Sequence, residues 1–269
     1  MTLPTTIPGR AGELLASLGD RAVLCDLYDE VGSEVYHDMA GRDPQEVREL
    51  LGLVRATPGP VLDLAAGSGR LTMPLLALGR EVTALDLSEH MLALLRTRLG
   101  LAPAALRERC SVVRGDMSTF ALGRRFPVIV LGTTSVSLLD EPGRAGLYEA
   151  VRAHLEPGGR FLLTTVAVDP AYTGPAEMEE KYTTDSGRAY RIFEYWATGD
   201  AARTVTIFPA DAGAATGPVE VCTTRVGVLP ADRLEAELAA AGFTVRGRTA
   251  LPAVSRRLGD VLLETEVRS

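Results

Sequence analysis

Residues 61–71 read VLDLAAGSGRL, an apolar run that ends in a cluster of small residues and then enters a helical pattern. Small residues at 65–69 allow the backbone to turn tightly and to come close to a ligand. The start of the following helix presents unpaired N–H groups and a partial positive charge, which suits a carboxylate or a phosphate. The stretch therefore predicts a strand, a ligand-binding turn and a helix, although an ordinary tight turn can have the same sequence pattern.

The alternation of apolar runs and helical patterns continues along the chain. Short apolar runs expected as strands cover 59–65, 81–85, 111–114, 127–131 and 160–166. Leucines and alanines at helical spacing cover 44–56, 71–78, 88–99 and 142–155. Strands that alternate with helices of this length predict βαβ units around a parallel sheet, and therefore an α/β fold.

The pattern changes after residue 166. Four of the seven tyrosines and the only tryptophan fall within 167–228. Three runs there indicate antiparallel strands separated by turns, at 188–197, 203–209 and 219–228. A helix and two strands then resume the alternation, at 231–241, 244–250 and 260–266. We expect a helical segment or lid at 1–58, a core domain at 59–166 and 229–269, and a β-rich, substrate-binding insertion at 167–228.

Composition excludes several classes of protein. The 269 residues carry a net charge of −7, so a nucleic acid is not an expected partner. No apolar run reaches the roughly 18–20 residues that span a bilayer, and the N-terminus does not resemble a signal peptide. The three cysteines, at 25, 110 and 222, form no CxxC pair, so neither a metal site nor a disulfide framework is expected. We expect a cytoplasmic protein that does not bind a membrane.

Two further acids lie where strands are expected to end. Asp86 closes the run 82–86, where a carboxylate can accept hydrogen bonds from both hydroxyls of a ribose. Asp116 follows the run 112–114, within reach of an adenine amino group. Ligands of open α/β sheets bind at the carboxyl ends of the strands. Either acid could instead cap the next helix or face water, but the coincidence of three such strand ends favours a binding site.

These motifs resemble those of the class I S-adenosylmethionine-dependent methyltransferases over about residues 20–166 and 230–267. Asp63, Gly67 and Gly69 match the glycine-rich signature of the family, and Ala65 stands where its first glycine is usual. Because alanine carries a methyl group, we expect Ala65 to have a negative φ or the turn to be slightly wider. The segment LEPGG at 155–159 matches the turn before the fifth strand.

The resemblance implies a Rossmann-like seven-stranded sheet of order 3-2-1-4-5-7-6, with strand seven antiparallel and the β-rich insertion after strand five. It also implies S-adenosyl-L-methionine as the cofactor and no metal. The implied cofactor-binding residues are Tyr28, Asp63, Ala65, Gly67, Gly69, Arg70, Asp86, Leu87, Met91, Gly115, Asp116, Met117, Gly132 and Thr133.

A dinucleotide-dependent dehydrogenase is the competing interpretation, because its fingerprint also combines a glycine-rich turn with an acid about 20 residues later. Here Thr72 stands in place of the third glycine, and that fold has no need for Asp63 or Asp116. The GxxxxGK[ST] loop of nucleoside triphosphatases is absent from the sequence. Both comparisons favour the methyltransferase.

Residues 24–36 (LCDLYDEVGSEVY) and 130–140 (VLGTTSVSLLD) resemble actinobacterial peptide-tailoring N-methyltransferases. These include enzymes that methylate glycopeptide antibiotics and enzymes that dimethylate the terminal amine of ribosomally made daptide peptides. Thr224 follows Cys-Thr where the glycopeptide enzymes carry a histidine, which favours the daptide-like branch. The alternatives are an O- or N-methyltransferase of a small metabolite or aminosugar, and a non-catalytic cofactor-binding scaffold.

The methyl group of a sulfonium is already activated, so catalysis requires mainly the alignment of a neutral amine. Tyr28 and Tyr36 could close over the cofactor and the reacting nitrogen, or be core aromatics, and His37 is the candidate base. Thr134 and Ser135 could orient the amine or cap the next segment. Candidate substrate contacts in the insertion, which could equally be packing residues, are Tyr190, Glu194, Trp196, Thr224 and Arg225. A homodimer is left open.

Overall fold

A computed structural model describes residues 6–39, 44–169, 171–184, 186–197, 199–251 and 258–268. These residues form two compact units, each built around one sheet. The first unit lies within 1–42 and 173–228, and the second within 43–172 and 229–269. The second unit contains the glycine-rich stretch and is called the core unit below; the first is called the insertion unit.

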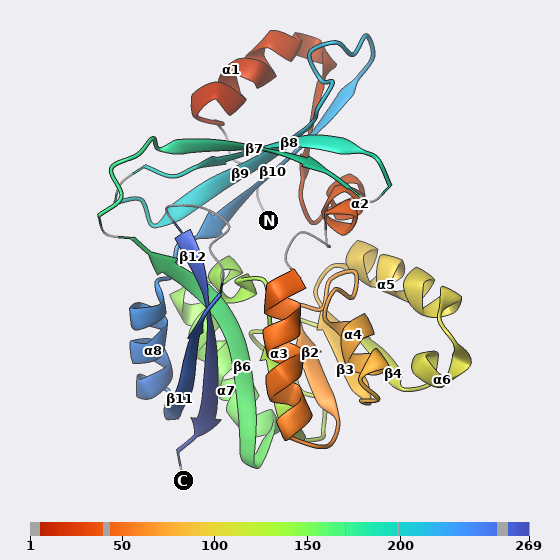
Figure 1. Cartoon of the computed structure of the whole chain (residues 1–269), viewed down its shortest axis with the longest axis vertical. Coiled ribbons are helices and arrows are strands. Elements are labelled where there is room, and N and C mark those ends of the chain that lie inside the picture. The colour runs from red at the N-terminus through yellow and green to blue at the C-terminus, as the bar shows by residue number, and fades with distance from the viewer. Residues whose placement is uncertain are drawn as a thin grey trace. The chain divides into compact units, whose positions relative to one another are not determined.

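The core unit contains a seven-stranded sheet of order β11-β12-β6-β5-β2-β3-β4 (Figure 1). Its strands are β2 (Val61–Leu64), β3 (Val82–Asp86), β4 (Cys110–Arg114), β5 (Phe126–Leu131), β6 (Leu155–Val168), β11 (Phe243–Ala250) and β12 (Leu258–Val267). When these seven strands are numbered from 1 to 7 along the chain, the order read from β4 to β11 is 3-2-1-4-5-7-6. The strand β12 runs antiparallel to β6, as the resemblance implied. The predicted Rossmann-like fold is confirmed.

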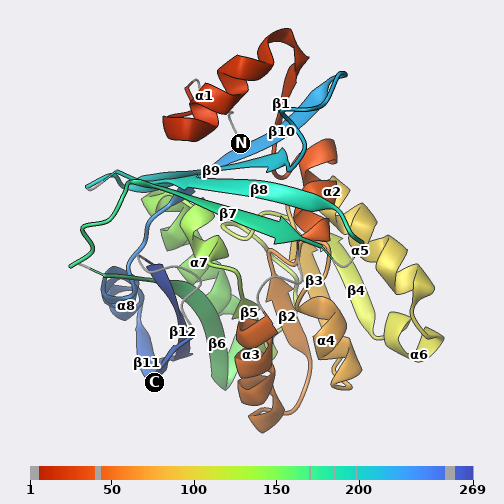
Figure 2. The same cartoon turned by 45° about the horizontal axis from the view of Figure 1, so that its top comes forward.

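Helices cover both faces of this sheet (Figures 1 and 2). On one face lie α3 (Pro44–Ala56), α4 (Thr72–Ala77) and α5 (Glu89–Leu101). On the other lie α7 (Glu141–His154) and α8 (Ala231–Ala240). Short helices η2 (Ser135–Leu138) and α6 (Ala104–Arg107) lie in the connections. Every residue of β2 and β5 is buried, as expected for central parallel strands that are covered on both faces.

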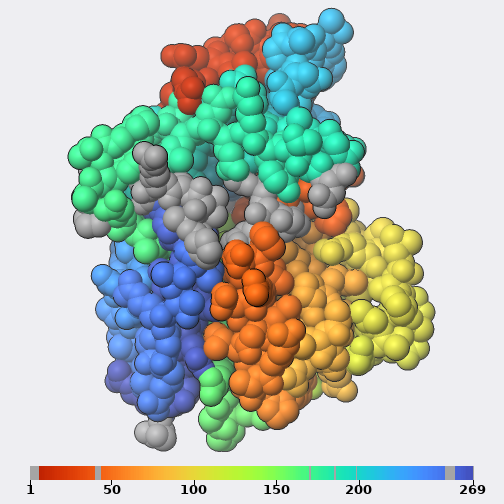
Figure 3. Space-filling view, in the orientation of Figure 1, coloured from red at the N-terminus to blue at the C-terminus, as the bar shows by residue number. Residues whose placement is uncertain are grey.

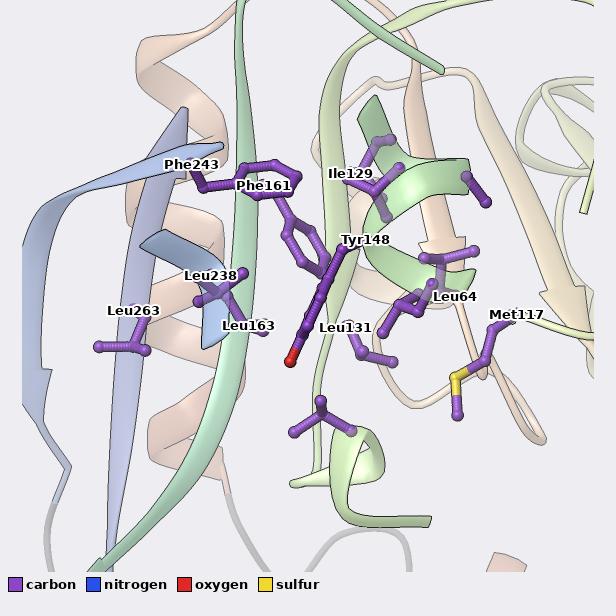
Figure 4. Close-up of a cluster of buried hydrophobic side chains, with 14 of the residues drawn as sticks. Leu64, Met117, Ile129, Leu131, Tyr148, Phe161, Leu163, Leu238, Phe243 and Leu263 are labelled. Carbon is purple, nitrogen blue, oxygen red and sulfur yellow. The ribbon is translucent and has the colours of Figure 1, made fainter. Parts of the chain in front are cut away.

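The side of the sheet that faces α7 and α8 is filled by leucine and aromatic side chains (Figure 4). The Phe243 ring packs near two other rings: its centroid lies 6.0 Å from that of Phe161 and 6.4 Å from that of Tyr148. Pairs at this spacing add to the stability that burial provides. The opposite side is covered by the helix α3, whose outer surface lies between β11–β12 and the helices α4 to α6 in Figure 3.

The insertion unit contains a five-stranded sheet of order β1-β10-β9-β8-β7. Its strands are β1 (Ala22–Asp26), β7 (Glu177–Thr183), β8 (Ala189–Tyr195), β9 (Ala202–Pro209) and β10 (Val219–Gly227). The helix α1 (Gly9–Leu18), which leads into the short helix η1 (Gly19–Arg21), packs on one apolar cluster of this sheet. The helix α2 (Glu30–Asp38) packs on another. The β-rich character predicted for residues 167–228 therefore corresponds to the strands β7 to β10.

The segment 1–58 differs from the single helical segment that the sequence predicts. Its residues 22–26 form β1, which pairs in parallel with β10 at the edge of the insertion sheet. Its last helix, α3, belongs to the core unit instead. The strand β1 has only five residues, and its partner lies almost 200 residues away, so the local pattern carried no sign of the pairing.

That pairing also brings two cysteines together. Cys25 and Cys222 are register partners in β1 and β10, and their sulfur atoms lie 3.1 Å apart as free thiols. The hydrogen bond between the two thiols lowers the pKa of Cys25 and, together with burial, raises the pKa of Cys222. Within the described residues, no cluster of histidine, cysteine and acidic side chains is suited to a metal ion. No helix in these same ranges has the length and apolar character needed to cross a membrane.

Candidate methyltransferase site

The carboxyl ends of β2, β3, β4 and β5 meet at one edge of the core sheet, because these four strands run parallel in adjacent positions. These strand ends and the segments that follow them carry fifteen of the residues singled out from the sequence. They are Asp63, Ala65, Gly67, Gly69, Arg70, Asp86, Leu87, Met91, Gly115, Asp116, Met117, Gly132, Thr133, Thr134 and Ser135. The topology therefore brings all of the core-unit candidates to a single rim.

The turn after β2 has three residues in the left-handed region of backbone conformation. The φ angles are +50° at Ala65, +54° at Gly67 and +89° at Gly69. A side chain at Gly69 would place its Cβ 2.5 Å from the Leu95 side chain, so the turn needs glycine there. Of the two alternatives expected at Ala65, the negative φ is wrong, because this alanine lies in the left-handed region; the slightly wider turn stays a prediction.

Replacing Ala65 with glycine should therefore stabilise the protein. A non-glycine residue in the left-handed region costs about 1–2 kcal/mol, and the extra freedom of glycine in the unfolded chain returns about 0.5–1 kcal/mol of that. We expect a gain of up to about 1 kcal/mol in the free energy of unfolding, measured by urea denaturation. Ala77, which lies in α4, is the matched control, because an alanine-to-glycine change in a helix should destabilise by a similar amount. A loss of stability at Ala65 would contradict the strain.

Asp86 connects the turn to the end of β3. Its Oδ2 accepts the Gly67 N–H at 2.8 Å and its Oδ1 accepts the Ser88 N–H at 2.8 Å. Burial raises the pKa of this carboxyl group, and the backbone N–H bonds oppose that shift. A carboxylate has about four acceptor positions, so the backbone donors Gly67, Ser88 and Leu87 leave acceptor capacity for a ligand. The next side chain, Leu87, is 63% exposed, whereas Met91 one turn later is buried.

Asp63 is enclosed within β2. Its side chain is 1% exposed and accepts the Thr72 hydroxyl at 2.6 Å. Burial raises the pKa of Asp63 to about 7, although the Thr72 bond and the positive charge of Arg70 act in the opposite direction. A carboxyl group that is half protonated at neutral pH next to a ligand-binding turn is typical of a functional site.

Asp116 follows β4 and holds its own turn. Its Oδ1 accepts both the N–H of Ser118, at 2.8 Å, and the hydroxyl of Ser118, at 2.7 Å. Asp116 thus holds a turn and does not cap a helix, because the next element along the chain is β5, and it uses only one of the two carboxylate oxygens for this purpose. Gly115 donates its N–H to the Asp86 carbonyl at 3.0 Å, which fixes the two loops to each other.

The loop after β5 is strained. Thr133 and Thr134 have φ angles of +59° and +54°, and both are β-branched. Such conformations cost about 1–3 kcal/mol each and persist where the surroundings enforce them. Gly132 precedes them, and a Cβ there would lie 2.6 Å from Leu71 and 3.1 Å from Glu46.

Glu46, on α3, is the functional candidate that the sequence interpretation missed. Its Oε1 accepts the Thr133 N–H and the Thr164 hydroxyl, each at 2.6 Å, and its Oε2 pairs with Arg70. The side chain is only 3% exposed. A signal was present, because Glu46, Leu50 and Val54 follow one another at intervals of four along the buried stripe of α3. A charged residue within an apolar stripe indicates a buried partner.

The comparisons with known proteins agree with this geometry. A family model described as a methyltransferase domain matches residues 61–159. The crystal structure of the glycopeptide N-methyltransferase MtfA, complexed with S-adenosyl-L-methionine, is 40% identical in sequence with a TM-score of 0.69. The similarity covers 97% of this chain and 98% of that one. The chain belongs to the class I S-adenosylmethionine-dependent methyltransferases.

Other relatives cover different parts of this methyltransferase. The dTDP-3-amino-3,4,6-trideoxy-alpha-D-glucopyranose N,N-dimethyltransferase of Streptomyces venezuelae is 34% identical over 150 residues, which are 54% of this chain and 56% of that protein. The chain thus spans about half the length of the curated relatives it matches. The CcbJ methyltransferase of Streptomyces caelestis is 21% identical with a TM-score of 0.74, covers 93% of this chain and 100% of that one, and shares the fold.

S-adenosyl-L-methionine is the cofactor of this methyltransferase family. MtfA has also been crystallised with sinefungin and with S-adenosyl-L-homocysteine. The described residues fit such a ligand, because the rim offers open acceptor positions on Asp86 beside an exposed apolar side chain, Leu87.

The remaining candidates of the methyltransferase lie in the insertion unit. The ring centroids of Tyr28 and Tyr36 lie 5.9 Å apart, and the ring planes meet at 48°. Tyr36 and His37 are neighbours in α2, and Tyr28 lies just before this helix. Tyr28 and Tyr36 pack against the apolar cluster that contains Tyr190. The structure therefore brings these side chains to one face of the insertion sheet, and their catalytic roles stay predictions.

The candidate substrate contacts of the insertion unit have partners of their own. The Tyr190 hydroxyl donates to Asp38 at 3.0 Å, and the Trp196 indole donates to the Asp200 carbonyl at 2.7 Å. Glu194 pairs with Arg203 at 3.0 Å. By contrast, Thr224 is 1% exposed, and its hydroxyl has no hydrogen-bond partner among the residues that the structure describes. Arg225, next to it, is exposed.

Proposed function

We propose that this methyltransferase methylates an amine of a peptide natural product. The observation that carries the proposal is the extent of the similarity to the glycopeptide enzyme, which includes 97% of this chain and so takes in the insertion unit as well as the core. The curated sugar-modifying relatives match only about half of the chain, and the amino pentose methyltransferase CalS10 matches 89% of it but at 22% identity, against 40% for MtfA. Substrate choice in such an enzyme depends on the part outside the cofactor domain, so the full-length similarity favours a peptide over an aminosugar.

The terminal amine of a daptide-type peptide is the preferred substrate in this proposal, with one or two methylations of the same nitrogen. Thr224 supports this choice, because the glycopeptide enzymes that the sequence resembles carry a histidine there and a threonine hydroxyl is a poor base. Glycopeptide N-methylation is the next alternative. We further propose that the enzyme acts in the cytoplasm, with no nucleic acid or membrane as a partner; a homodimer stays open.

The cofactor assignments follow from the hydrogen-bond acceptors at the rim that the protein itself does not use. Asp86 keeps acceptor capacity beyond its backbone bonds, which suits the hydroxyls of the ribose. The second oxygen of Asp116 suits the adenine amino group, and the exposed Leu87 side chain suits the face of the ring. Asp63 carries the charge that suits an ammonium group at the amino-acid end. The remaining contacts are assigned to Tyr28, Ala65, Gly67, Gly69, Arg70, Met91, Gly115, Met117, Gly132 and Thr133.

Bound S-adenosyl-L-methionine supplies a methyl group that its sulfonium charge already activates. The work left to the chain is to orient a neutral amine and to exclude water. We assign this to Tyr28 and Tyr36, whose ring faces also attract a positive charge by about 0.5–2 kcal/mol, and to Thr134 and Ser135. His37 is the candidate that would accept the proton, and water is the alternative acceptor.

Mass spectrometry of a matched substrate panel tests the proposal. The panel contains a peptide with a free terminal amine, the same peptide with that amine acetylated, a glycopeptide and a dTDP-aminosugar. We expect one or two methyl groups on the free-amine peptide and none on its acetylated form. Methylation of the aminosugar alone would establish the metabolite alternative. Binding of S-adenosyl-L-homocysteine without transfer to any amine would favour the scaffold.

A further inference from the structure

The loop after β5 requires an external restraint to keep its shape. Two consecutive threonines, Thr133 and Thr134, hold left-handed φ angles that β-branched residues rarely adopt. They lie between Gly132, which the cofactor assignment uses, and Ser135, which the substrate assignment uses. A strained loop at this position is informative, because strain persists only where the surrounding structure enforces it.

The restraint comes from one buried carboxylate. Glu46 accepts the backbone N–H of Thr133 at 2.6 Å. It also accepts the hydroxyl of Thr164 at 2.6 Å, and that same hydroxyl accepts the N–H of Thr134 at 3.0 Å. Both strained N–H groups are thus held by Glu46, one directly and one through Thr164 on β6.

The same carboxylate also holds a side chain of the glycine-rich turn. The Nη2 atom of Arg70 pairs with Glu46 and donates to the Thr133 hydroxyl at 2.5 Å. The side chains of Arg70 and Glu46 are only 11% and 3% exposed. Glu46 therefore joins the loops after β2 and β5, which both border the assigned cofactor pocket.

We infer that Glu46 is a positioning residue that sets the shape of the cofactor pocket by holding Arg70 and the loop 132–134 in place. It acts through these residues, and Thr164 extends its reach to Thr134. The inference rests on the assignment of the cofactor pocket in the proposed function. It does not depend on which amine is methylated.

Binding of S-adenosyl-L-homocysteine, measured by calorimetry, is the assay that separates this role from general stability. Thr164→Val removes the hydroxyl that links Glu46 to Thr134, whereas Thr164→Ser keeps it. Thr165→Val is the matched control: Thr165 is the next residue of β6, is equally buried, and donates its hydroxyl to the Leu229 carbonyl instead. Glu46→Gln removes the charge and replaces one carboxylate oxygen with an amide NH₂ group. At least one of the groups that donate to Glu46 then faces another donor. Thermal unfolding of every variant reports its loss of stability.

We expect Thr164→Val and Glu46→Gln each to weaken binding about tenfold or more, which corresponds to about 1.4 kcal/mol. Thr164→Ser should restore wild-type affinity to within about threefold. Thr165→Val should lose stability as Thr164→Val does and keep its affinity. Equal effects of the two valine variants, or wild-type binding by Thr164→Val, would overturn the inference. If Glu46→Gln does not fold, the three threonine variants still decide.

The proposed function fails in a different assay. A protein that binds S-adenosyl-L-homocysteine in the pattern above but transfers no methyl group to the peptide panel would retain the positioning role of Glu46 and lose the proposed substrate. Peptide methylation with no difference between Thr164→Val and Thr165→Val would do the reverse.

Discussion

Asp86→Ala is expected to lower the affinity for S-adenosyl-L-homocysteine by about 10²- to 10³-fold. The Asp86 carboxylate would accept hydrogen bonds from the two ribose hydroxyls, and hydrogen bonds to a charged group contribute about 1.5–3 kcal/mol each. A total near 3–4 kcal/mol corresponds to that loss, since each factor of ten is about 1.4 kcal/mol. The variant also releases the Gly67 N–H, which Asp86 holds at 2.8 Å. Isothermal titration calorimetry measures the change.

Asp140→Ala is the matched control for this experiment. Asp140 caps α7 by accepting the Gly143 N–H at 2.9 Å, so its loss also removes an aspartate that holds a backbone donor. We expect its affinity to stay within about threefold of wild type. Wild-type affinity in Asp86→Ala, or an equal loss in both variants, would contradict the ribose assignment. Tighter binding of NAD than of S-adenosyl-L-homocysteine by the wild type would revive the dehydrogenase.

The affinity for S-adenosyl-L-methionine is expected to fall as the pH drops below about 7. The pKa of Asp63 is raised to about 7 by burial, so the Asp63 carboxyl group of the ligand-free protein is largely protonated at lower pH. Only the ionised carboxylate attracts the ammonium group at the amino-acid end of the ligand. Between pH 8 and pH 5.5 the dissociation constant should therefore rise by up to about thirtyfold, following the fraction of ionised Asp63.

Asp63→Asn identifies the group responsible, because burial raises the pKa of Asp86 as well. We expect the variant to bind weakly at every pH and to lose the pH dependence. Persistence of the wild-type slope in Asp63→Asn would contradict the assignment and point to Asp86.

The same variant should be more stable than wild type without ligand at pH 8. The pKa of Asp63 in the folded protein, about 7, lies above 3.8, the usual pKa of an aspartate exposed to water. Its contribution to stability is thus fully present below about pH 4 and is lost as the pH rises through 7. Asparagine avoids the burial of that charge, for a gain on the order of 1–3 kcal/mol. Urea denaturation at pH 8 and at pH 5 measures it, and the gain should shrink at the lower pH.

The α/β class and the parallel strands could be predicted from local signals and connectivity, whereas the order of the strands was implied by the resemblance to the methyltransferase family. Helical and strand periodicity locate the elements, and parallel strands joined by helices place their carboxyl ends at one edge. Asp63 lies in a strand, Asp86 ends one and Asp116 follows one, so their convergence did not require knowledge of side-chain contacts. The short edge strand β1 was missed because its partner lies far away in the chain. The first insertion strand, β7, was missed because its sequence is mostly polar and shows no apolar alternation, although it pairs with the neighbouring strand β8.

By itself, the amino-acid sequence determined an α/β core and the edge at which the candidate residues gather, because hydrophobic spacing along the chain encodes alternating strands and helices. The motifs shared with the methyltransferase family added the order of the strands. Only the tertiary structure decided that Ala65 takes a left-handed φ, that Cys25 meets Cys222, and that Glu46 holds the loop after β5. The last two depend on atoms from segments far apart in the chain, and the energy of such contacts comes from burial and hydrogen bonding that no local pattern records.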